Sequence, residues 1–299
     1  MTRIVGLICA LFLLMTVGSA MAGEHRYADQ NGVKIHYVAT GEGPLVVMIH
    51  GFPDYWYTWR HLMPVLGADY RVAAVDLRGY NRSDKPAGVA NYAMPLLIGD
   101  IAAVITAEGA EKAIVIGHDW GAAIAWQVAL NAPQFVDRLV ILSVPHPRGF
   151  AREMATNADQ QANSQYARDF MAEGAEDALT AEGLAGWVRD PEAKKAYVEA
   201  FKRSDFSGML NYYRANYPQG AGEEGTAAQP PGLPQITSPV LVIHGLEDRA
   251  LNAAGHSGTW NWIDQDTTLL MIPNAGHFVQ HEATNLVNTT IRDWLAQRR

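Results

Sequence analysis

Asp119 stands at the centre of the stretch "VIGHDWGAAIAW" (Val115–Trp126), where an apolar run meets a helix-like segment of small residues. Gly117 and Gly121 permit a sharp strand-to-helix turn that exposes the central side chain beside the first amides of the helix. Serine is the usual central residue of such a nucleophile elbow. A carboxylate is ionised near pH 7 and needs no base to activate it. Asp119 is therefore either a nucleophile suited to saturated carbon or simply the N-cap of the helix.

Asp248 and His277 complete a candidate catalytic set. Asp248 follows the apolar run in "PVLVIHGLED", and His277 follows the run in "TLLMIPNAGH". The chain order Asp119, Asp248, His277 is the nucleophile–acid–base order of the α/β hydrolases. The pattern predicts that Asp248 orients His277 and that His277 acts as the base.

The loop "HGFPDYWYTWR" (His50–Arg60) follows the first buried strand and is expected to line the site. A loop in this position supplies one backbone amide of an oxyanion hole, so we assign the N–H groups of Phe52 and Trp120 to that role. The side chains expected in the substrate pocket are His50, Pro53, Trp56 and Trp120.

Short apolar runs alternate with helix-length segments along most of the chain. Continuous runs of this kind, ending in Gly, His or Asp, are typical of strands buried on both faces of a parallel sheet. The runs are "PLVVMIHG", "RVAAVDLRG", "AIVIGHDWG", "RLVILSVPHP", "PVLVIHGLED" and "TLLMIPNAGH". Asn31-Gly32 lies between two alternating segments and predicts a tight hairpin before them. The alternation predicts an α/β fold, a mostly parallel doubly wound sheet.

The alternation stops between Pro147 and Pro239. This segment has helical stretches, among them "EDALTAEGLAGWVRD" and "PEAKKAYVEAFKRSD", and ends in a Gly/Pro-rich connection. We interpret 147–239 as a helical cap inserted into a core formed by 23–146 and 240–299. Such a cap would cover the carboxyl ends of the strands, where ligands bind in open α/β sheets.

Residues 1–22 have the pattern of a signal peptide. Arg3 precedes an apolar stretch from Ile4 to Val17, and Ala20-Met21-Ala22 supplies small residues at a cleavage site. The stretch is shorter than the ~20 residues of a spanning helix. Cleavage near Ala22 predicts export to the periplasm or medium. It would also remove Cys9, the only cysteine, so the mature chain would hold no disulfide or thiolate site.

Composition narrows the function classes further. The chain has 299 residues, 48% of them hydrophobic, and a net charge of -8, which together indicate a large buried core. An acidic protein without a basic run is not expected to bind nucleic acid. The residues identify no metal or organic cofactor site and no oligomeric partner.

The chain resembles the epoxide hydrolases of the α/β-hydrolase fold along nearly its whole length. The motifs are "HGFPDYWYTWR", "DLRGYNRSDKP", "GHDWG", "SVPHP" and "NAGHFVQHE", in that family's order. The family's cap donates two tyrosine hydroxyls to the epoxide oxygen. The resemblance implies Tyr213, from "NYYRANY", and Tyr166, from "SQYARDFMAEG", with Tyr212 and Tyr217 as local competitors.

This resemblance implies a two-step reaction on a small apolar epoxide. Asp119 would open the ring and form an ester, and water activated by His277 would hydrolyse the ester to a vicinal diol. One alternative is a haloalkane or haloacid dehalogenase, which uses the same triad. Haloalkane dehalogenases commonly carry Asn where this chain has Phe52, and fluoroacetate dehalogenases carry Arg where it has Trp120. A non-catalytic ligand-binding protein is the other alternative, although the complete triad disfavours it.

Overall fold

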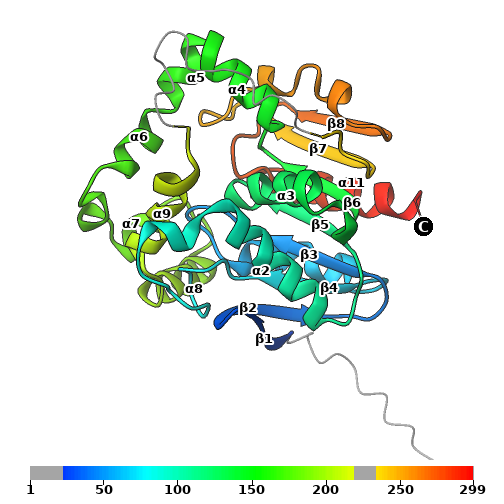
Figure 1. The fold of residues 1–299 in the computed structure, drawn as a ribbon, viewed down its shortest axis with the longest axis horizontal. Helices are drawn as coiled ribbons and strands as arrows, with labels where there is room; N and C mark the ends of the chain where they lie inside the picture. Colours follow the sequence, from blue (N-terminus) through cyan, green and yellow to red (C-terminus); the bar gives the residue numbers. More distant parts are fainter. Residues whose placement is uncertain (1–22, 219–233, 299) are drawn as a thin grey trace, which may run out of the picture.

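The computed structural model describes residues 23–218 and 234–298. The expected signal peptide and most of the Gly/Pro-rich connection lie outside these residues. The described residues form an eight-stranded sheet whose strand order is β1-β2-β4-β3-β5-β6-β7-β8 (Figure 1). The strands are β1 Glu24–Gln30, β2 Val33–Thr40, β3 Leu45–Ile49, β4 Arg71–Val75, β5 Ala113–His118, β6 Val136–Leu142, β7 Val240–Gly245 and β8 Thr267–Ile272.

The β1–β2 hairpin is the antiparallel edge of an otherwise parallel sheet. Asn31 and Gly32 take positive φ values of 53° and 88°, which a two-residue hairpin turn requires. Strand β2 pairs antiparallel with β4, and every later pairing is parallel. The predicted hairpin and the predicted parallel sheet are therefore confirmed.

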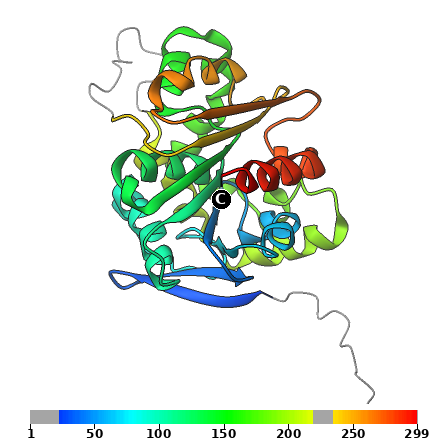
Figure 2. The ribbon, with the colours of Figure 1, turned by 90° about the vertical axis from the view of Figure 1, so that its right-hand side faces the viewer.

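Helices cover both faces of the sheet, as a doubly wound fold requires. Successive strand residues face opposite ways, so Val47 packs with the cluster containing α2 and α3, while Met48 packs with the cluster containing α11. Figure 2 shows α11 on the opposite side of the sheet from α3. The helices around the sheet are η1 Trp56–His61, α1 Met63–Leu66, η2 Val89–Tyr92, α2 Met94–Ala107, α3 Trp120–Asn131, η3 Pro133–Phe135, η5 Ala253–His256, η6 Thr259–Trp262, α10 Val279–Glu282 and α11 Thr284–Ala296.

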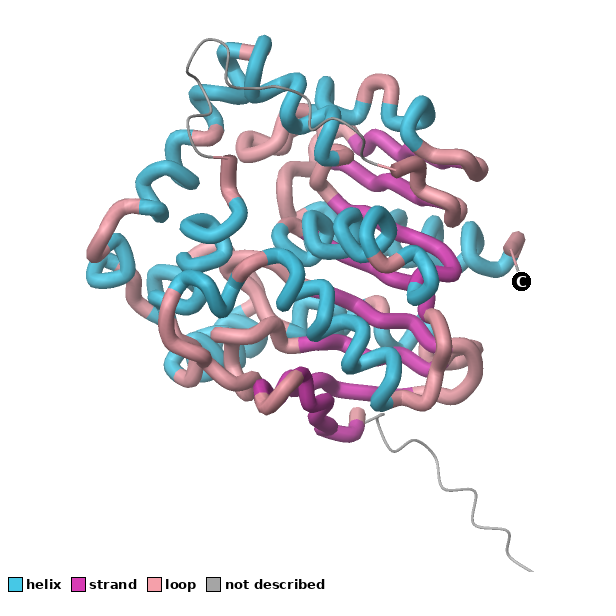
Figure 3. Tube along the Cα trace, viewed as in Figure 1, coloured by secondary structure: helices cyan, strands magenta, loops and turns pink. Residues whose placement is uncertain are grey.

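The segment between β6 and β7 is helical in its described part and lies beyond one end of the sheet (Figures 1 and 3). We call this segment, residues 147–239, the cap; its limits as a separate domain stay a prediction. Its helices are α4 Pro147–Thr156, α5 Ala158–Asn163, α6 Gln165–Met171, η4 Ala175–Ala178, α7 Ala181–Leu184, α8 Pro191–Lys202 and α9 Phe206–Asn216.

The stretch 176–190 differs from its helical prediction. It contains only the short η4 and α7, followed by a turn. Thr180 is extended and its hydroxyl accepts a hydrogen bond from the Gly183 N–H, so it starts a new helix rather than continuing one. Gly183 and Gly186 are poor helix formers, and the chain leaves the helix before Trp187. The apolar side chains of this stretch, among them Leu184 and Val188, are buried although the stretch does not form one continuous helix.

None of the helices in the described ranges is long and apolar enough to cross a membrane.

Candidate active site

Asp119 lies at the turn between β5 and α3, with φ 52° and ψ −125°. A non-glycine residue held in this conformation is strained, which is typical of a nucleophile elbow. Its side chain makes no capping hydrogen bond to α3, so the N-cap interpretation of the carboxylate does not hold. The backbone carbonyl of Asp119 instead accepts from the N–H groups of Ala122 and Ala123. The turn therefore frees the carboxylate to face the cap.

The loop after β3 contacts one oxygen of this carboxylate. The Phe52 N–H donates to Asp119 Oδ1 at 2.6 Å. A Cβ on Gly51 would lie 2.1 Å from the same oxygen, so only glycine permits this approach. The Phe52 amide thus lies where the predicted oxyanion hole requires it. The Trp120 amide lies at the first residue of α3, and its role stays a prediction.

His277 joins Asp119 to Asp248. Its Nδ1 lies 2.8 Å from Asp248 Oδ2, and its Nε2 lies 3.3 Å from Asp119 Oδ2. The other oxygen of Asp248 accepts from the N–H groups of Ala250 and Leu251. Because Asp248 is fully buried and bonded on both oxygens, it holds the imidazole in one orientation.

The charges of these three groups stabilise one another. Burial would lower the pKa of His277, but the charge of Asp248 and the hydrogen bonds to both carboxylates outweigh it and raise that pKa to about 10. Burial would raise the pKa of Asp119, but the hydrogen bond and charge of His277 hold it below its ordinary value. The same charge lowers the pKa of Asp248 against its burial. The resting site is therefore an imidazolium between two carboxylates.

Two residues that were not predicted from the sequence hold His277. His118 Nε2 lies 2.8 Å from the His277 carbonyl oxygen, and the Ser143 hydroxyl donates to the same oxygen at 2.7 Å. Both side chains are buried. His118 directly precedes Asp119 in "GHDWG", and Ser143 begins "SVPHP", so both lay within motifs already quoted.

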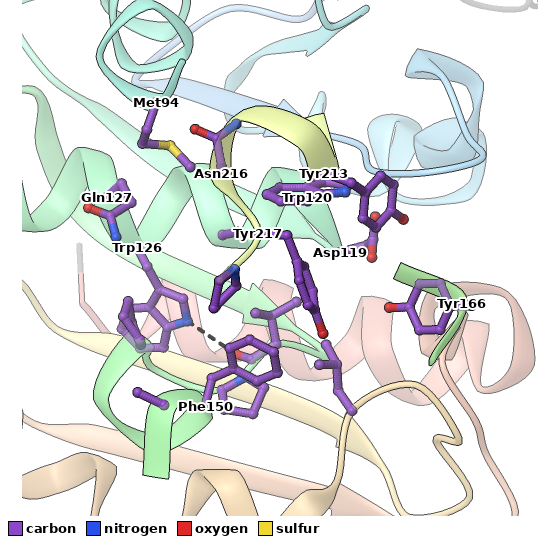
Figure 4. Close-up of a pocket in the computed structure, with 17 residues that line it drawn as sticks. Met94, Asp119, Trp120, Trp126, Gln127, Phe150, Tyr166, Tyr213, Asn216 and Tyr217 are labelled. Carbon is purple, nitrogen blue, oxygen red and sulfur yellow. Dashed lines mark hydrogen bonds between the residues drawn. The ribbon is translucent and has the colours of Figure 1, made fainter. Parts of the chain in front are cut away.

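The two cap tyrosines lie opposite the elbow (Figure 4). Tyr166 on α6 and Tyr213 on α9 have ring centroids 6.2 Å apart at 85°, and the hydroxyl of Tyr166 points toward Asp119. Burial and the charge of Asp119 raise the pKa of both phenols well above the ordinary value, so both remain protonated donors. Of the competitors, the hydroxyl of Tyr212 donates to the Arg78 carbonyl, away from the carboxylate. Tyr217 lines only one of the two cavities that meet at Asp119.

Those two cavities share Asp119, Tyr166 and Tyr213. The first has a volume of about 370 Å³ and runs between mostly apolar side chains that include Trp120, Trp126 and Phe150 (Figure 4). The second has a volume of about 610 Å³ and opens past His277 toward the charged residues Glu247, Arg249 and Glu282. Asp119 therefore faces an apolar chamber on one side and a charged opening on the other.

Two residues predicted for the substrate pocket lie elsewhere, while Pro53 and Trp120 each line one of the cavities. His50 is buried behind the loop: the Leu77 N–H donates to its Nε2, and its Nδ1 lies 2.8 Å from the Gly51 carbonyl. It supports the backbone that carries Phe52 and lines neither cavity.

Trp56 also lies outside both cavities. It begins η1, and its ring packs edge-on against His25 at 6.2 Å, on the far side of the loop. The loop turns into η1 immediately after Tyr55, which directs Trp56 away from Asp119.

No group of three or more His, Cys, Asp or Glu side chains within 23–218 and 234–298 is arranged to hold a metal ion.

Comparison with known proteins agrees with this geometry. Residues 44–284 match the model of the alpha/beta hydrolase fold family. The chain is 34% identical to the AB hydrolase superfamily protein YfhM of Bacillus subtilis, over 90% of this chain and 97% of the relative. It is 33% identical to epoxide hydrolase 1 of Caenorhabditis elegans, over 91% of this chain and 70% of that relative. The crystal structure of Bacillus megaterium epoxide hydrolase with an inhibitor superposes with a TM-score of 0.83 and 31% identity, covering 91% of this chain and all of that one.

The predicted fold class is thus confirmed, and the chain belongs to the alpha/beta hydrolase fold family and, within it, groups with the epoxide hydrolases.

Proposed function

We propose that this chain hydrolyses epoxides to vicinal diols through an ester on Asp119. One observation carries the proposal: a buried, ionised carboxylate faces two protonated tyrosines on the cap side and His277 on the core side. An epoxide needs a nucleophile for its carbon and an acid for its oxygen. The relatives named epoxide hydrolases support the same conclusion.

In the first step, Asp119 Oδ2 attacks one carbon of the epoxide ring from the side opposite the ring oxygen. Oδ1 accepts the Phe52 N–H at 2.6 Å, whereas the contact of Oδ2 with His277 Nε2 is longer, at 3.3 Å, so we assign the attack to Oδ2. The ring C–O bond breaks, and the oxygen takes a proton from Tyr166 or Tyr213. Hydrogen bonding from both phenols lowers the barrier because alkoxide is a poor leaving group.

Ester formation changes the charge beside His277. The carboxylate of Asp119 stabilises imidazolium in the resting site, and the ester carries no charge. The pKa of His277 therefore falls when the ester forms. The released proton restores the tyrosine that was deprotonated, and neutral His277 becomes available as a base.

In the second step, His277 takes a proton from a water molecule, which attacks Cγ of the ester. Negative charge develops on Oδ1, where the Phe52 N–H already donates. The intermediate collapses and expels the diol oxygen, which takes the remaining proton of the attacking water from the new carboxyl group. The end point is the resting pair of Asp119 carboxylate and His277 imidazolium, so the cycle closes.

The shape and lining of the cavities favour an epoxide that carries one apolar substituent. The chamber lined by Trp120, Trp126 and Phe150 suits an aryl or alkyl substituent, and burial of each methylene there contributes ~0.8 kcal/mol. The charged opening past His277 suits the entry of water.

A parallel assay of epoxides and alkyl halides with the same aryl or alkyl arm tests this function. We expect diol from the epoxides and no halide release. Halide release with no diol would instead identify a dehalogenase, which uses the same triad. Absence of both products with every arm would contradict a catalytic role.

We also propose that the chain is exported after cleavage near Ala22. The charged Arg3, the apolar stretch and the small residues before Gly23 support this proposal. N-terminal sequencing of the protein recovered from periplasm or medium should begin at Gly23. Recovery of the protein from the cytosol with an uncleaved N-terminus would contradict export.

A further inference from the structure

Trp187 lies in the turn between α7 and α8, within the stretch 176–190 whose sequence predicts helix. Its indole contacts two core loops at once. The indole N–H donates to the Pro53 carbonyl at 3.3 Å, and the ring stacks on Phe278 at 4.0 Å with the planes 8° apart. The hydrogen bond is long, so the stack is the stronger of the two contacts.

Each contacted residue is the chain neighbour of a reacting group. Pro53 follows Phe52, whose N–H donates to Asp119 Oδ1. Phe278 follows His277, which lies between Asp119 and Asp248. One cap side chain therefore connects the oxyanion donor with the base.

A second cap residue reinforces the same loop. Tyr197 on α8 donates its hydroxyl to Asp54 Oδ1 at 2.8 Å, and its ring packs edge-on against Trp187 at 5.2 Å and 80°. Both Tyr197 and Asp54 are fully buried. Tyr197 therefore restricts the Trp187 ring, and the restricted ring holds Pro53 and Phe278 in position.

We propose that Trp187 is a positioning residue for ester hydrolysis. This inference rests on the proposed function for its kinetic consequence. The Phe52 N–H and His277 act together in the second step, when charge grows on Oδ1 and a proton leaves water. Tyr166 and Tyr213, which serve ring opening, are carried by α6 and α9. Loss of the indole contacts therefore slows the second step selectively.

Trp187→Leu and Trp187→Phe separate the two contacts. Phenylalanine keeps an aromatic ring over Phe278 and loses the N–H, whereas leucine loses both. In single-turnover assays we expect ester hydrolysis to slow ~10-fold or more in Trp187→Leu, and less in Trp187→Phe, because small misplacements of reacting groups are costly. Ring opening should stay within about twofold, and intact-mass spectrometry should show accumulated ester.

Trp294→Phe is the matched control. Trp294 is buried on α11, its indole N–H donates to the Thr268 hydroxyl, and neither residue lines either cavity. The Trp294→Phe variant loses an indole hydrogen bond, as Trp187→Phe does. We expect the ratio of the rate of ring opening to the rate of ester hydrolysis to stay unchanged in Trp294→Phe.

Hydrogen exchange supplies a readout that needs no substrate. In Trp187→Leu we expect faster exchange in peptides covering 50–55 and 276–282, and no change there in Trp294→Phe. Unchanged exchange in both peptides would overturn the inference, as would equal slowing of both chemical steps. If the unaltered enzyme formed neither ester nor diol, the proposed function would fail while the exchange result still decided the role of Trp187.

Discussion

The catalytic core and the cap hold their reactive side chains by different means. In the core, Asp119 and Asp248 accept backbone N–H groups at strand ends, and His277 is fixed through its own carbonyl. In the cap, Tyr166 and Tyr213 project from short helices and are held by ring contacts with Phe170 and with each other.

This difference assigns different properties to the two halves of the site. Hydrogen bonds from the backbone at the strand ends fix the position and the orientation of the triad. Aromatic packing tolerates substitution and small shifts better. The core therefore supplies the nucleophile and the base, and the cap supplies the two phenols and, through Trp187, contacts that hold the core loops in position.

Removal of the core nucleophile should have the largest effect. Asp119→Ala leaves no oxygen to form the ester, and we expect turnover to fall by ~10⁴-fold or more, measured as diol formation. Far-ultraviolet circular dichroism provides the folding control. Near-normal diol production by the folded variant would refute the covalent route.

Removal of the core base should separate the two steps. His277→Gln keeps Asp119 and the tyrosines, so ring opening should continue while ester hydrolysis falls by ~10³-fold or more. Mass spectrometry of the protein after incubation with substrate should show the mass of enzyme plus epoxide. An unmodified variant that still consumes epoxide would contradict the ester.

Single changes in the cap should have smaller effects. Tyr213→Phe or Tyr166→Phe leaves one phenol to protonate the leaving oxygen, so we expect ring opening to slow ~10-fold to 100-fold. The double variant should nearly stop it. Tyr212→Phe is the control, because its hydroxyl bonds the Arg78 carbonyl outside both cavities and its loss should leave ring opening unchanged. A Tyr212 effect as large as that of Tyr213 would show that the wrong phenol was assigned.

The charges of Asp119, Asp248 and His277 predict that the stability of the protein depends on pH. His277, with its pKa raised to about 10, stabilises the fold fully below ~6.5, and this contribution is lost as pH rises through about 10. Asp119 and Asp248, with lowered pKa values, contribute above ~4, and their contribution is lost as pH falls. The difference in Tm between the unaltered protein and His277→Gln should therefore be largest near pH 5–6 and shrink toward pH 10. A difference that grows across that range would contradict the imidazolium.

The smallest effect should appear in the pH profile of ester hydrolysis. This step requires neutral His277, and the ester of Asp119 no longer stabilises the imidazolium. The rate should rise with pH and level off at an apparent pKa below the value of about 10 that describes the resting site. Stopped-flow measurement of the second step checks this shift. An apparent pKa equal to that of the resting enzyme would show that ester formation does not change the charge around His277.

The same contrast explains what the sequence could predict. Parallel strands deliver their carboxyl ends to one edge, so Asp119, Asp248 and His277 could be grouped from their positions after apolar runs. Tyr166 and Tyr213 could be named only by resemblance. His50 and Trp56 were misplaced because the direction of a loop side chain depends on hydrogen bonds and turns that spacing does not encode. The contacts of Trp187 could not be predicted, because the apolar spacing around it is typical of a helix and the chain forms a turn there.

The carbonyl of His277 has a mechanical consequence. It accepts hydrogen bonds from Ser143, at the end of β6, and from His118, the residue before the nucleophile. The base is thereby attached to the same strand end that carries Asp119. These two hydrogen bonds couple the position of the imidazole to that of the elbow. Binding of an epoxide and release of a diol therefore need not separate the base from the nucleophile, because both are attached to the ends of neighbouring strands of the core.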